Sequence, residues 1–226
     1  AAAVRWLTLR VVVVEANGYT IRAGAYLNGA YLAGTNLTLA DLNGAYLNGA
    51  DLYMADLAGA NLHMADLRKA NLCDADLHMA DLSNASLEGA DLRKANLANA
   101  NLDRANLSGS TVFYGNFRGA RLRGANLSTA ILVNSDFTQA DLFNADLGRS
   151  NLQGTVFAGS NLSYTDLYLA TLTNADLPYA KFRYASLLAA NAGNAELVRA
   201  DLTGADLRFT NLAGADLAEA ILTGAD

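Results

Sequence analysis

A period of five residues runs without interruption from Ala25 to Asp226. A large apolar residue stands at Leu27 and at every fifth position as far as Leu222, and Leu fills 34 of these 40 central positions. Two residues before each central position stands Ala, Ser, Thr or, once, Gly115. A period this regular, with no inserted loop, is typical of a repeat architecture. We therefore expect one stacked solenoid rather than separate globular domains.

The five-residue unit indicates a stretch of extended backbone followed by a corner. Its two apolar positions are two residues apart, which places both side chains on one face of a strand and the Asp or Asn between them on the other. Gly is frequent at the last position, as at Gly29 and Gly204, and suits the second central residue of a type II turn, which needs a positive φ. The only proline, Pro178, falls at the first central position of such a turn, where its fixed φ fits. Each unit is therefore expected to form one short side and one corner.

This pattern resembles the pentapeptide-repeat family, in units such as Ala-Asn-Leu-Ser-Gly and Ala-Asp-Leu-Thr-Gly, and the resemblance covers residues 25–226. It implies an all-β solenoid, the right-handed quadrilateral β-helix, in which four pentads make each square coil. Residues 25–226 would then form a single domain of about ten four-sided coils, a rod about 48 Å long at about 4.8 Å per coil. Residues 20 apart in the sequence would lie directly above one another.

The implied four-sided coil gives the chain four sides, which we number from its first unit. Side one starts with residues 25–29, side two with 30–34, side three with 35–39 and side four with 40–44, and each side recurs every 20 residues. Any position that departs from the repeat can therefore be assigned to a side.

Two irregularities affect the expected core. Phe117, Phe137 and Phe157 are 20 residues apart on side three, which predicts a continuous aromatic ladder inside the rod. Gly115 replaces the small residue beside the first Phe and is expected to make room for it. Ala192 replaces the central Leu in its column, which predicts either a small void or a locally deformed coil, at a cost of about 2–5 kcal/mol relative to Leu.

Residues 1–24 precede the repeat and are expected to form an N-terminal β cap over the first coil. Alternating and β-branched residues predict a strand from Leu9 to Ala16. The dipeptide Asn17-Gly18 suits a two-residue hairpin turn, and Tyr19 to Arg22 would be the return strand. Trp6 is expected to cover the open end of the core.

The formal net charge is −6 and the pI about 4.8, which disfavours direct binding to nucleic acid or to an anionic membrane. No apolar run reaches the roughly 18 residues of a membrane span. Cys73 is the only cysteine, so no disulfide can form within the chain. The sequence indicates no compartment beyond a cytoplasmic default, because the chain starts at Ala1 without Met and targeting segments can lie outside it.

No catalytic, metal or cofactor site is expected. His63, Cys73 and His78 have the chemistry of soft-metal ligands, but they fall on sides four, two and three and cannot meet at one ion. Both histidines fall on regular corners, where no cleft is expected beside them. The recurrent glycines are turn positions and do not form a phosphate-binding loop. We therefore expect the protein not to be an enzyme and to need no cofactor.

Side three carries most of the net charge, because its outward positions hold seven acidic and two basic residues, a balance of −5. Several of its corners hold Ala, so we expect a flat and smooth acidic side. The candidate acidic interaction side consists of Asp56, Asp76, Asp136, Asp176, Glu196 and Asp216. Gyrase-protecting quinolone-resistance proteins of the same family resemble duplex DNA in this way. The other interpretation is that Asp and Asn solubilise the rod and hydrogen-bond locally.

Two groups of outward residues are apolar where polar residues are usual. They are Phe113, Tyr114, Ile131 and Val133 on side two, and Tyr168, Leu188 and Phe209, with Leu169, on side one. Such clusters mark contact sites, pack locally at corners, or contact a further C-terminal cap. The last unit ends at Asp226 without a capping element, so self-association through the C-terminal end is also expected.

These observations predict a non-catalytic, rigid, rod-shaped scaffold for an unidentified protein partner. The alternative is a DNA-mimicking modulator of DNA gyrase or another type II topoisomerase.

Overall fold

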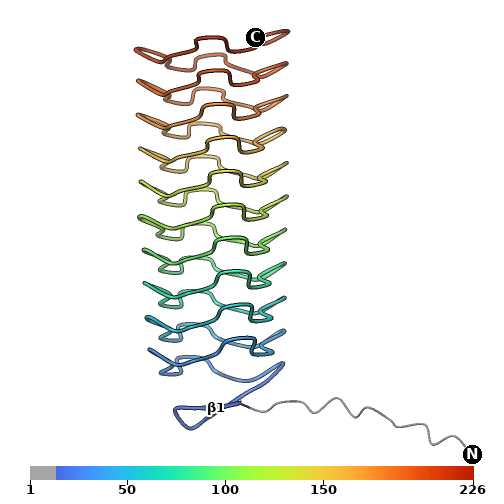
Figure 1. Cartoon of the computed structure of the whole chain (residues 1–226), viewed down its shortest axis with the longest axis vertical. Coiled ribbons are helices and arrows are strands. Elements are labelled where there is room, and N and C mark those ends of the chain that lie inside the picture. The colour runs from blue at the N-terminus through green and yellow to red at the C-terminus, as the bar shows by residue number, and fades with distance from the viewer. Residues whose placement is uncertain (1–13) are drawn as a thin grey trace, which may run out of the picture.

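The computed structural model describes residues 14–226, which form a straight rod with the N-terminal end at the bottom and the C-terminal end at the top of Figure 1. Its only regular strands are β1 (Val14–Ala16) and β2 (Tyr19–Ile21), an antiparallel hairpin below the first coil. Above the hairpin the chain winds in stacked coils of the same shape. Within the described residues, no helix is long and apolar enough to cross a bilayer.

Neighbouring coils are joined by single parallel bridges between residues 20 apart, from Tyr26–Tyr46 to Asp201–Ile221. The predicted vertical alignment of residues 20 apart is therefore confirmed. At each side the central N–H donates to the coil above, as Leu27 N–H does to the Tyr46 carbonyl (2.7 Å). The bridges recur at every fifth residue, so each coil is paired on four sides.

The corners are four-residue turns, in which the Ala30 N–H donates to the Leu27 carbonyl (3.0 Å). The second corner residue has a positive φ, as predicted for Gly29 (64°). Many other residue types adopt the same conformation, among them Leu39 (57°), because the ladder of hydrogen bonds between coils fixes the backbone there. The turn that contains Pro178 closes in the same way, so its predicted position is also confirmed.

The small and central residues of the units form one continuous buried core. Phe117 and Phe137 stack with ring centroids 4.5 Å apart, and Phe137 and Phe157 stack at 4.9 Å, which confirms the aromatic ladder. A Cβ on Gly115 would lie 2.6 Å from Val112 Cγ1 and 3.0 Å from the Phe117 ring. Gly115 therefore does leave the space that the first ring needs.

The coil at Ala192 keeps regular geometry. Ala192 is buried, its N–H donates to the Asn211 carbonyl (2.8 Å), and its carbonyl accepts the Ala195 N–H (3.2 Å). The alternative of a deformed coil is therefore wrong, because the backbone ladder keeps the corner in place without help from the side chain. The void stays a prediction.

The N-terminal hairpin agrees with the prediction where the structure describes it. Asn17 and Gly18 have φ values of 50° and 81°, as a two-residue turn requires. The return strand ends at Ile21 and not at Arg22, because the Arg22 carbonyl accepts the Ala25 N–H (3.1 Å) and so begins a corner. Residues 9–13 of the predicted first strand and Trp6 lie outside the described residues.

Candidate interaction surfaces

The outward Asp or Asn of each unit is part of the turn that follows it. Its side-chain oxygen accepts the N–H of the first corner residue, two positions along the chain. Asp56 accepts from Ala58 (3.0 Å), and Asp216 accepts from Ala218 (2.9 Å). Many of these side chains therefore have a structural role, which favours the interpretation of local hydrogen bonding.

The predicted acidic residues of side three lie in one column, but their charges are not equally free. Asp136 forms an ion pair with Arg118 (2.9 Å), and Asp76 accepts hydrogen bonds from the backbone and the ring of His78. Val156 interrupts the column, since it lies between Asp136 and Asp176 in the chain of bridges. The unneutralised charge is therefore concentrated farther along the rod.

Three acidic residues follow one another there, because Asp176 bridges to Glu196 and Glu196 bridges to Asp216. Asp176 lacks the usual turn hydrogen bond, since Pro178 has no N–H to donate. Burial, together with repulsion from Glu196, raises the pKa of Asp176. This short run is the most distinctive part of the acidic side.

Side three is not smooth near its N-terminal end, contrary to the expectation. A hollow of about 440 Å³ lies there between coils and is lined by Leu39, Gly59, His78 and Met79, with Thr38 and Ala58. Leu39 is 76% exposed and lies over Gly59, where an added Cβ would be 2.7 Å from Leu39 Cδ2. The hollow forms because corner side chains project past the flat part of the side. The expectation that no cleft lies beside a histidine is therefore wrong for His78.

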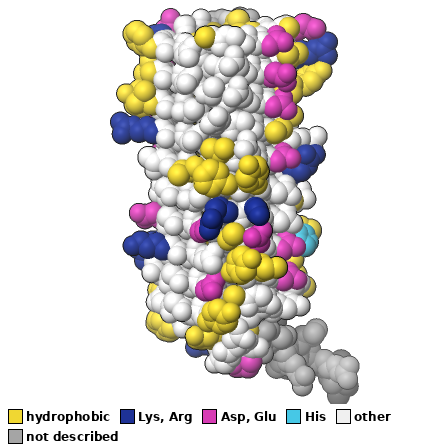
Figure 2. Space-filling view, turned by 90° about the vertical axis from the view of Figure 1, so that its left-hand side faces the viewer, with side chains coloured by type: hydrophobic (Ala, Val, Ile, Leu, Met, Phe, Trp, Pro, Cys, Tyr) yellow, Lys and Arg dark blue, Asp and Glu magenta, His cyan; other side chains and the backbone are white. Residues whose placement is uncertain are grey.

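The four apolar candidates of side two lie on neighbouring coils. Thr111 bridges to Ile131, so Phe113 and Tyr114 lie one coil below Ile131 and Val133. Tyr114 is 61% exposed, whereas Phe113 and Val133 are half-buried. Figure 2 shows a band of apolar side chains across the middle of the rod, above a pair of basic side chains. We call Phe113, Tyr114, Ile131 and Val133 the side-two patch.

The apolar candidates of side one also lie on successive coils, from Tyr168 and Leu169 through Leu188 to Phe209. Phe209 is 87% exposed, whereas Leu188 is half-buried. The guanidinium of Arg149 lies 5.9 Å from the centre of the Tyr168 ring, so that ring already has a partner. Phe209 is therefore the most available member of this group.

The histidines and the cysteine do not form a chemical site. Ser83 Oγ donates to Asp81 Oδ1 (2.6 Å), so the hydrogen bond between Ser83 and His63 Nδ1 (2.8 Å) needs the ring nitrogen as donor. This polarity is the reverse of what a base needs to activate a serine. Burial, and then a hydrogen bond to Asp74, raise the pKa of the Cys73 thiol, which disfavours the reactive thiolate. Among the residues that the structure describes, no group of three or more His, Cys, Asp or Glu side chains could hold a metal ion.

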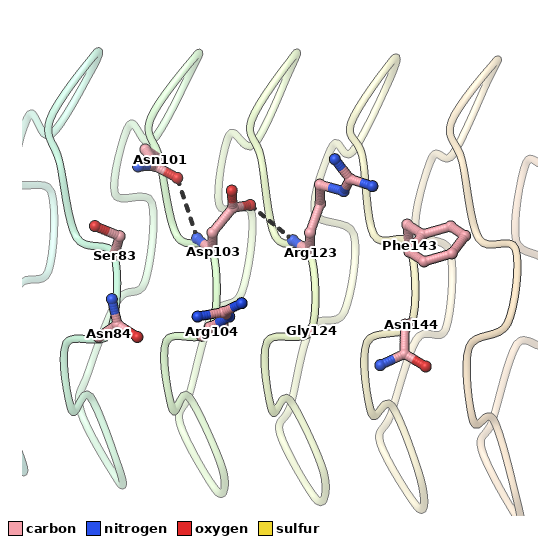
Figure 3. A pocket seen from close by; sticks show the side chains of 9 residues that line it. All are labelled: Ser83, Asn84, Asn101, Asp103, Arg104, Arg123, Gly124, Phe143 and Asn144. Atoms are coloured by element: carbon pink, nitrogen blue, oxygen red, sulfur yellow. Dashed lines mark hydrogen bonds between the residues drawn. The ribbon is translucent and has the colours of Figure 1, made fainter.

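A second hollow, of about 530 Å³, lies on side four and was missed by the sequence analysis. Figure 3 shows that its lining residues lie in rows along the rod. In the row of Ser83, Asp103, Arg123 and Phe143, Asp103 accepts the Arg123 N–H (3.0 Å), and the oxygen of Asn101, from the same coil as Asp103, accepts the Asp103 N–H (3.2 Å). Arg104 extends from the corner of one coil over Gly124 of the next, where an added Cβ would lie 3.8 Å from Arg104 Cγ. A signal for this hollow was present in the sequence, because the basic Arg123 and the aromatic Phe143 stand 20 residues apart at the same corner position.

Together these features define a solenoid whose core is sealed and whose recognition chemistry lies in its outward columns. The family of pentapeptide repeats matches residues 23–53, 52–89, 80–112, 116–149, 150–187 and 195–226, in 8 copies. The chain therefore belongs to the pentapeptide-repeat family. Proteins of this family fold as right-handed quadrilateral β-helices and are generally non-enzymatic structural or interaction proteins.

Solved structures of the family resemble this chain to different degrees. HetL, a pentapeptide repeat protein involved in heterocyst differentiation regulation from the cyanobacterium Nostoc sp. strain PCC 7120, is 35% identical over 89% of both chains, with a TM-score of 0.57. Rfr23 from the cyanobacterium Cyanothece 51142 is 35% identical over 40% of this chain and 63% of its own, with a TM-score of 0.40. QnrB1, a plasmid-mediated fluoroquinolone resistance protein, is 17% identical over 83% of this chain and 89% of its own, with a TM-score of 0.42. A comparison with curated protein sequences gave no match.

Proposed function

We propose that this protein is a non-catalytic, rigid scaffold that presents its outward columns to a protein partner. The observation that carries this proposal is that the inward side chains of the coils are buried, whereas the outward side chains face the surroundings. The central and small residues are buried from Leu27 to Ala205, and coils are joined by backbone hydrogen bonds throughout. Only the outward positions can therefore contact another molecule, and the family is one that mediates protein–protein interactions.

The side-two patch supports this function most directly. Tyr114 and Ile131 are exposed on neighbouring coils of the same side, where other units carry polar residues. An exposed aromatic and aliphatic pair of this kind is typical of a contact site. We propose that this patch is the centre of the interface.

The test compares two variants that both place Asp on an exposed apolar position of side two. Tyr114→Asp with Ile131→Asp changes the patch, whereas Tyr31→Asp changes a tyrosine of the same exposure (61% and 62%) near the N-terminal end. Partners captured from the native host are compared by quantitative mass spectrometry, and thermal melting verifies the fold. We expect only the first variant to lose its partners. Identical partner sets for all three proteins would exclude the side-two patch.

The second candidate function is DNA mimicry toward a type II topoisomerase. It is favoured by one observation, the three consecutive acidic residues Asp176, Glu196 and Asp216 on one side of a rod. The protein would then change gyrase supercoiling in a titration, and the variant Glu196→Lys with Asp216→Lys would lose the effect. No change in supercoiling at micromolar protein would reject this function.

We also propose that residues 1–24 act as a cap for the repeat, residues 25–226, of about ten coils. Ile21 of the hairpin is 1% exposed, and Tyr19 packs against the core beside it. Ile21→Asp should therefore expose the first coil and lower the thermal melting temperature, whereas Thr20→Ser, on the exposed side of the same strand, keeps the hydroxyl group that donates to Glu15 and should leave it unchanged.

We propose that the apolar candidates of side one, Tyr168, Leu169, Leu188 and Phe209, which we call the side-one group, contact a second copy of the chain. Phe209 carries this proposal because of its exposure. Leu188→Asp with Phe209→Asp should abolish any self-association measured by light scattering. An oligomer that persists in this variant would exclude the side-one group.

A further inference from the structure

Side four carries a series of basic and aromatic side chains on five consecutive coils, which we call the side-four strip. The strip consists of Arg104, Arg121, Arg123, Phe143, Tyr164, Lys181, Arg183 and Tyr184. The hollow shown in Figure 3 lies at its N-terminal end, between the side chains of Arg104 and Arg123. No proposal above uses these residues.

The strip is positive on a protein that is negative overall. Its five basic residues face three acidic neighbours, Asp103, Asp141 and Asp201, a local balance of +2 against a net charge of −6 for the chain. Three of the five basic residues are neutralised, because Arg121 pairs with Asp103, Arg123 with Asp141 and Arg183 with Asp201.

The other two basic side chains are available to a ligand. Arg104 and Lys181 form no ion pair within residues 14–226. The strip therefore has positive charge at both ends that the protein itself does not balance.

The aromatic side chains of the strip lie next to one another along the rod, with Tyr164 and Tyr184 stacked and Phe143 tilted by 58° to Tyr164. The Arg123 guanidinium lies 5.3 Å from the centre of the Phe143 ring, the Phe143 and Tyr164 centroids are 5.3 Å apart, and Tyr164 and Tyr184 are 5.2 Å apart. The ring of Tyr184 covers Gly204, whose added Cβ would lie 2.6 Å from it. Tyr164 and Tyr184 are about half exposed, so a ligand would meet the edges of these rings and their hydroxyl groups.

We infer that the side-four strip binds an acidic, extended segment of a protein partner, laid along the axis of the rod; this inference rests on the proposed scaffold function. The strip spans four coil spacings, about 19 Å, which matches about six residues of extended peptide. Carboxylates near the two ends of the segment would face the guanidinium group of Arg104 and the ammonium group of Lys181. The tyrosine hydroxyl groups would supply hydrogen bonds to the peptide backbone.

Single-stranded nucleic acid fits the strip less well. Such ligands stack their bases on open aromatic faces, and here Arg123 covers one face of Phe143 and Tyr184 covers one face of Tyr164. The net charge of −6 also repels a polyanion that extends beyond the strip. An acidic peptide of limited length avoids both costs.

The test measures fluorescence anisotropy of a labelled peptide of alternating Glu and Ser, about eight residues long so that it exceeds the strip. The variant Arg104→Glu with Lys181→Glu should weaken binding at least about tenfold, since each change replaces attraction with repulsion. The matched control, Lys69→Glu with Lys94→Glu, makes the same change in net charge at exposed corners of sides one and two and should bind like the wild type.

Three results would overturn the inference: no saturable binding by the wild-type protein, an equal loss in both double variants, or tighter binding of an oligothymidine of similar length. The variant Tyr114→Asp with Ile131→Asp separates this inference from the proposed function, because it should still bind the acidic peptide. If the peptide does not bind while partner capture still depends on Tyr114 and Ile131, only the side-four inference fails.

Discussion

At the scale of single residues, the outward Asp and Asn side chains close the turns of this fold. In Asp146 the side-chain oxygen accepts the Gly148 N–H at 2.9 Å, a bond that the short side chain of Asp or Asn can make to its own turn. Some of these carboxylates also bind an arginine of the same corner, and hydrogen bonds from Arg208 lower the pKa of Asp206 to about 2. The regularity of this position is therefore structural in the first place.

Asp176 is an exception that gives a test. Its raised pKa, caused by burial and then by Glu196, means that the folded state disfavours its charge. The resulting cost to stability is present above the raised pKa and is relieved as the pH falls toward the unfolded value of 3.8. Asp176→Asn should therefore raise the free energy of unfolding at neutral pH by about 0.5 kcal/mol, given solvent screening, and the gain should vanish in acid. Thermal melting as a function of pH measures this difference.

Asp136 is the matched control for this prediction. Burial alone would raise its pKa, but the hydrogen bonds from Thr138 and Arg118 outweigh burial and hold the pKa below the ordinary value. Its contribution to stability is thus present above the unfolded pKa and is lost as the pH falls. Asp136→Asn should destabilise the protein at neutral pH, and the same sign for both variants would contradict our account.

At the scale of the coil, stability comes from the four central side chains and their vertical neighbours. Several Ser and Thr residues are tolerated beside them because the hydroxyl group donates to the turn, as Thr155 Oγ1 does to the Leu152 carbonyl (2.6 Å), whereas the buried hydroxyl of Ser110 has no partner among the described residues. Ala192 leaves its coil without one central side chain, although the backbone is unchanged. The coil is therefore not distorted, and we expect it to be under-packed.

Ala192→Leu should raise the free energy of unfolding by about 2 kcal/mol, because it adds buried methyl groups to a column whose backbone already fits Leu. Leu172→Ala, one coil below in the same column, should destabilise by about 2–5 kcal/mol and provides the comparison. Chemical denaturation measures both values. Unchanged or lower stability of the Leu variant would show that the space at Ala192 is already filled.

At the scale of the whole molecule, each coil contacts only the coils next to it, so stability should decrease toward the ends. The N–H of Leu107 donates to Asn126 of the next coil (2.7 Å), whereas the N–H groups of Leu212 and Leu217 have no coil beyond them in the described chain. We expect amide hydrogen exchange to be slowest in the middle coils and fast at these two residues. Equal protection along the rod would instead indicate one cooperative unit.

The five-residue period predicted a solenoid with inward and outward side chains and a corner in each unit, because the period sets the direction of each side chain. The vertical alignment of residues 20 apart, and with it the ladder of Phe117, Phe137 and Phe157, was predicted through the resemblance to the pentapeptide-repeat family, since a period of five does not set the number of units in a coil. The hairpin turn at Asn17-Gly18 was also predictable, because it depends on local backbone preferences.

The contacts that the outward side chains make depend on neighbouring coils, and only the three-dimensional structure shows them. The two hollows depend on corner side chains that lie over a glycine of the next coil, as Leu39 does over Gly59 and Arg104 over Gly124. The environment of the Asp176 carboxyl group depends on the missing N–H at Pro178 and on Glu196, which lies 20 residues further along the chain. A period of five residues specifies whether a side chain points inward or outward, but the direction in which an outward side chain leans depends on the coil above, and this is why the core was predictable and the surface was not.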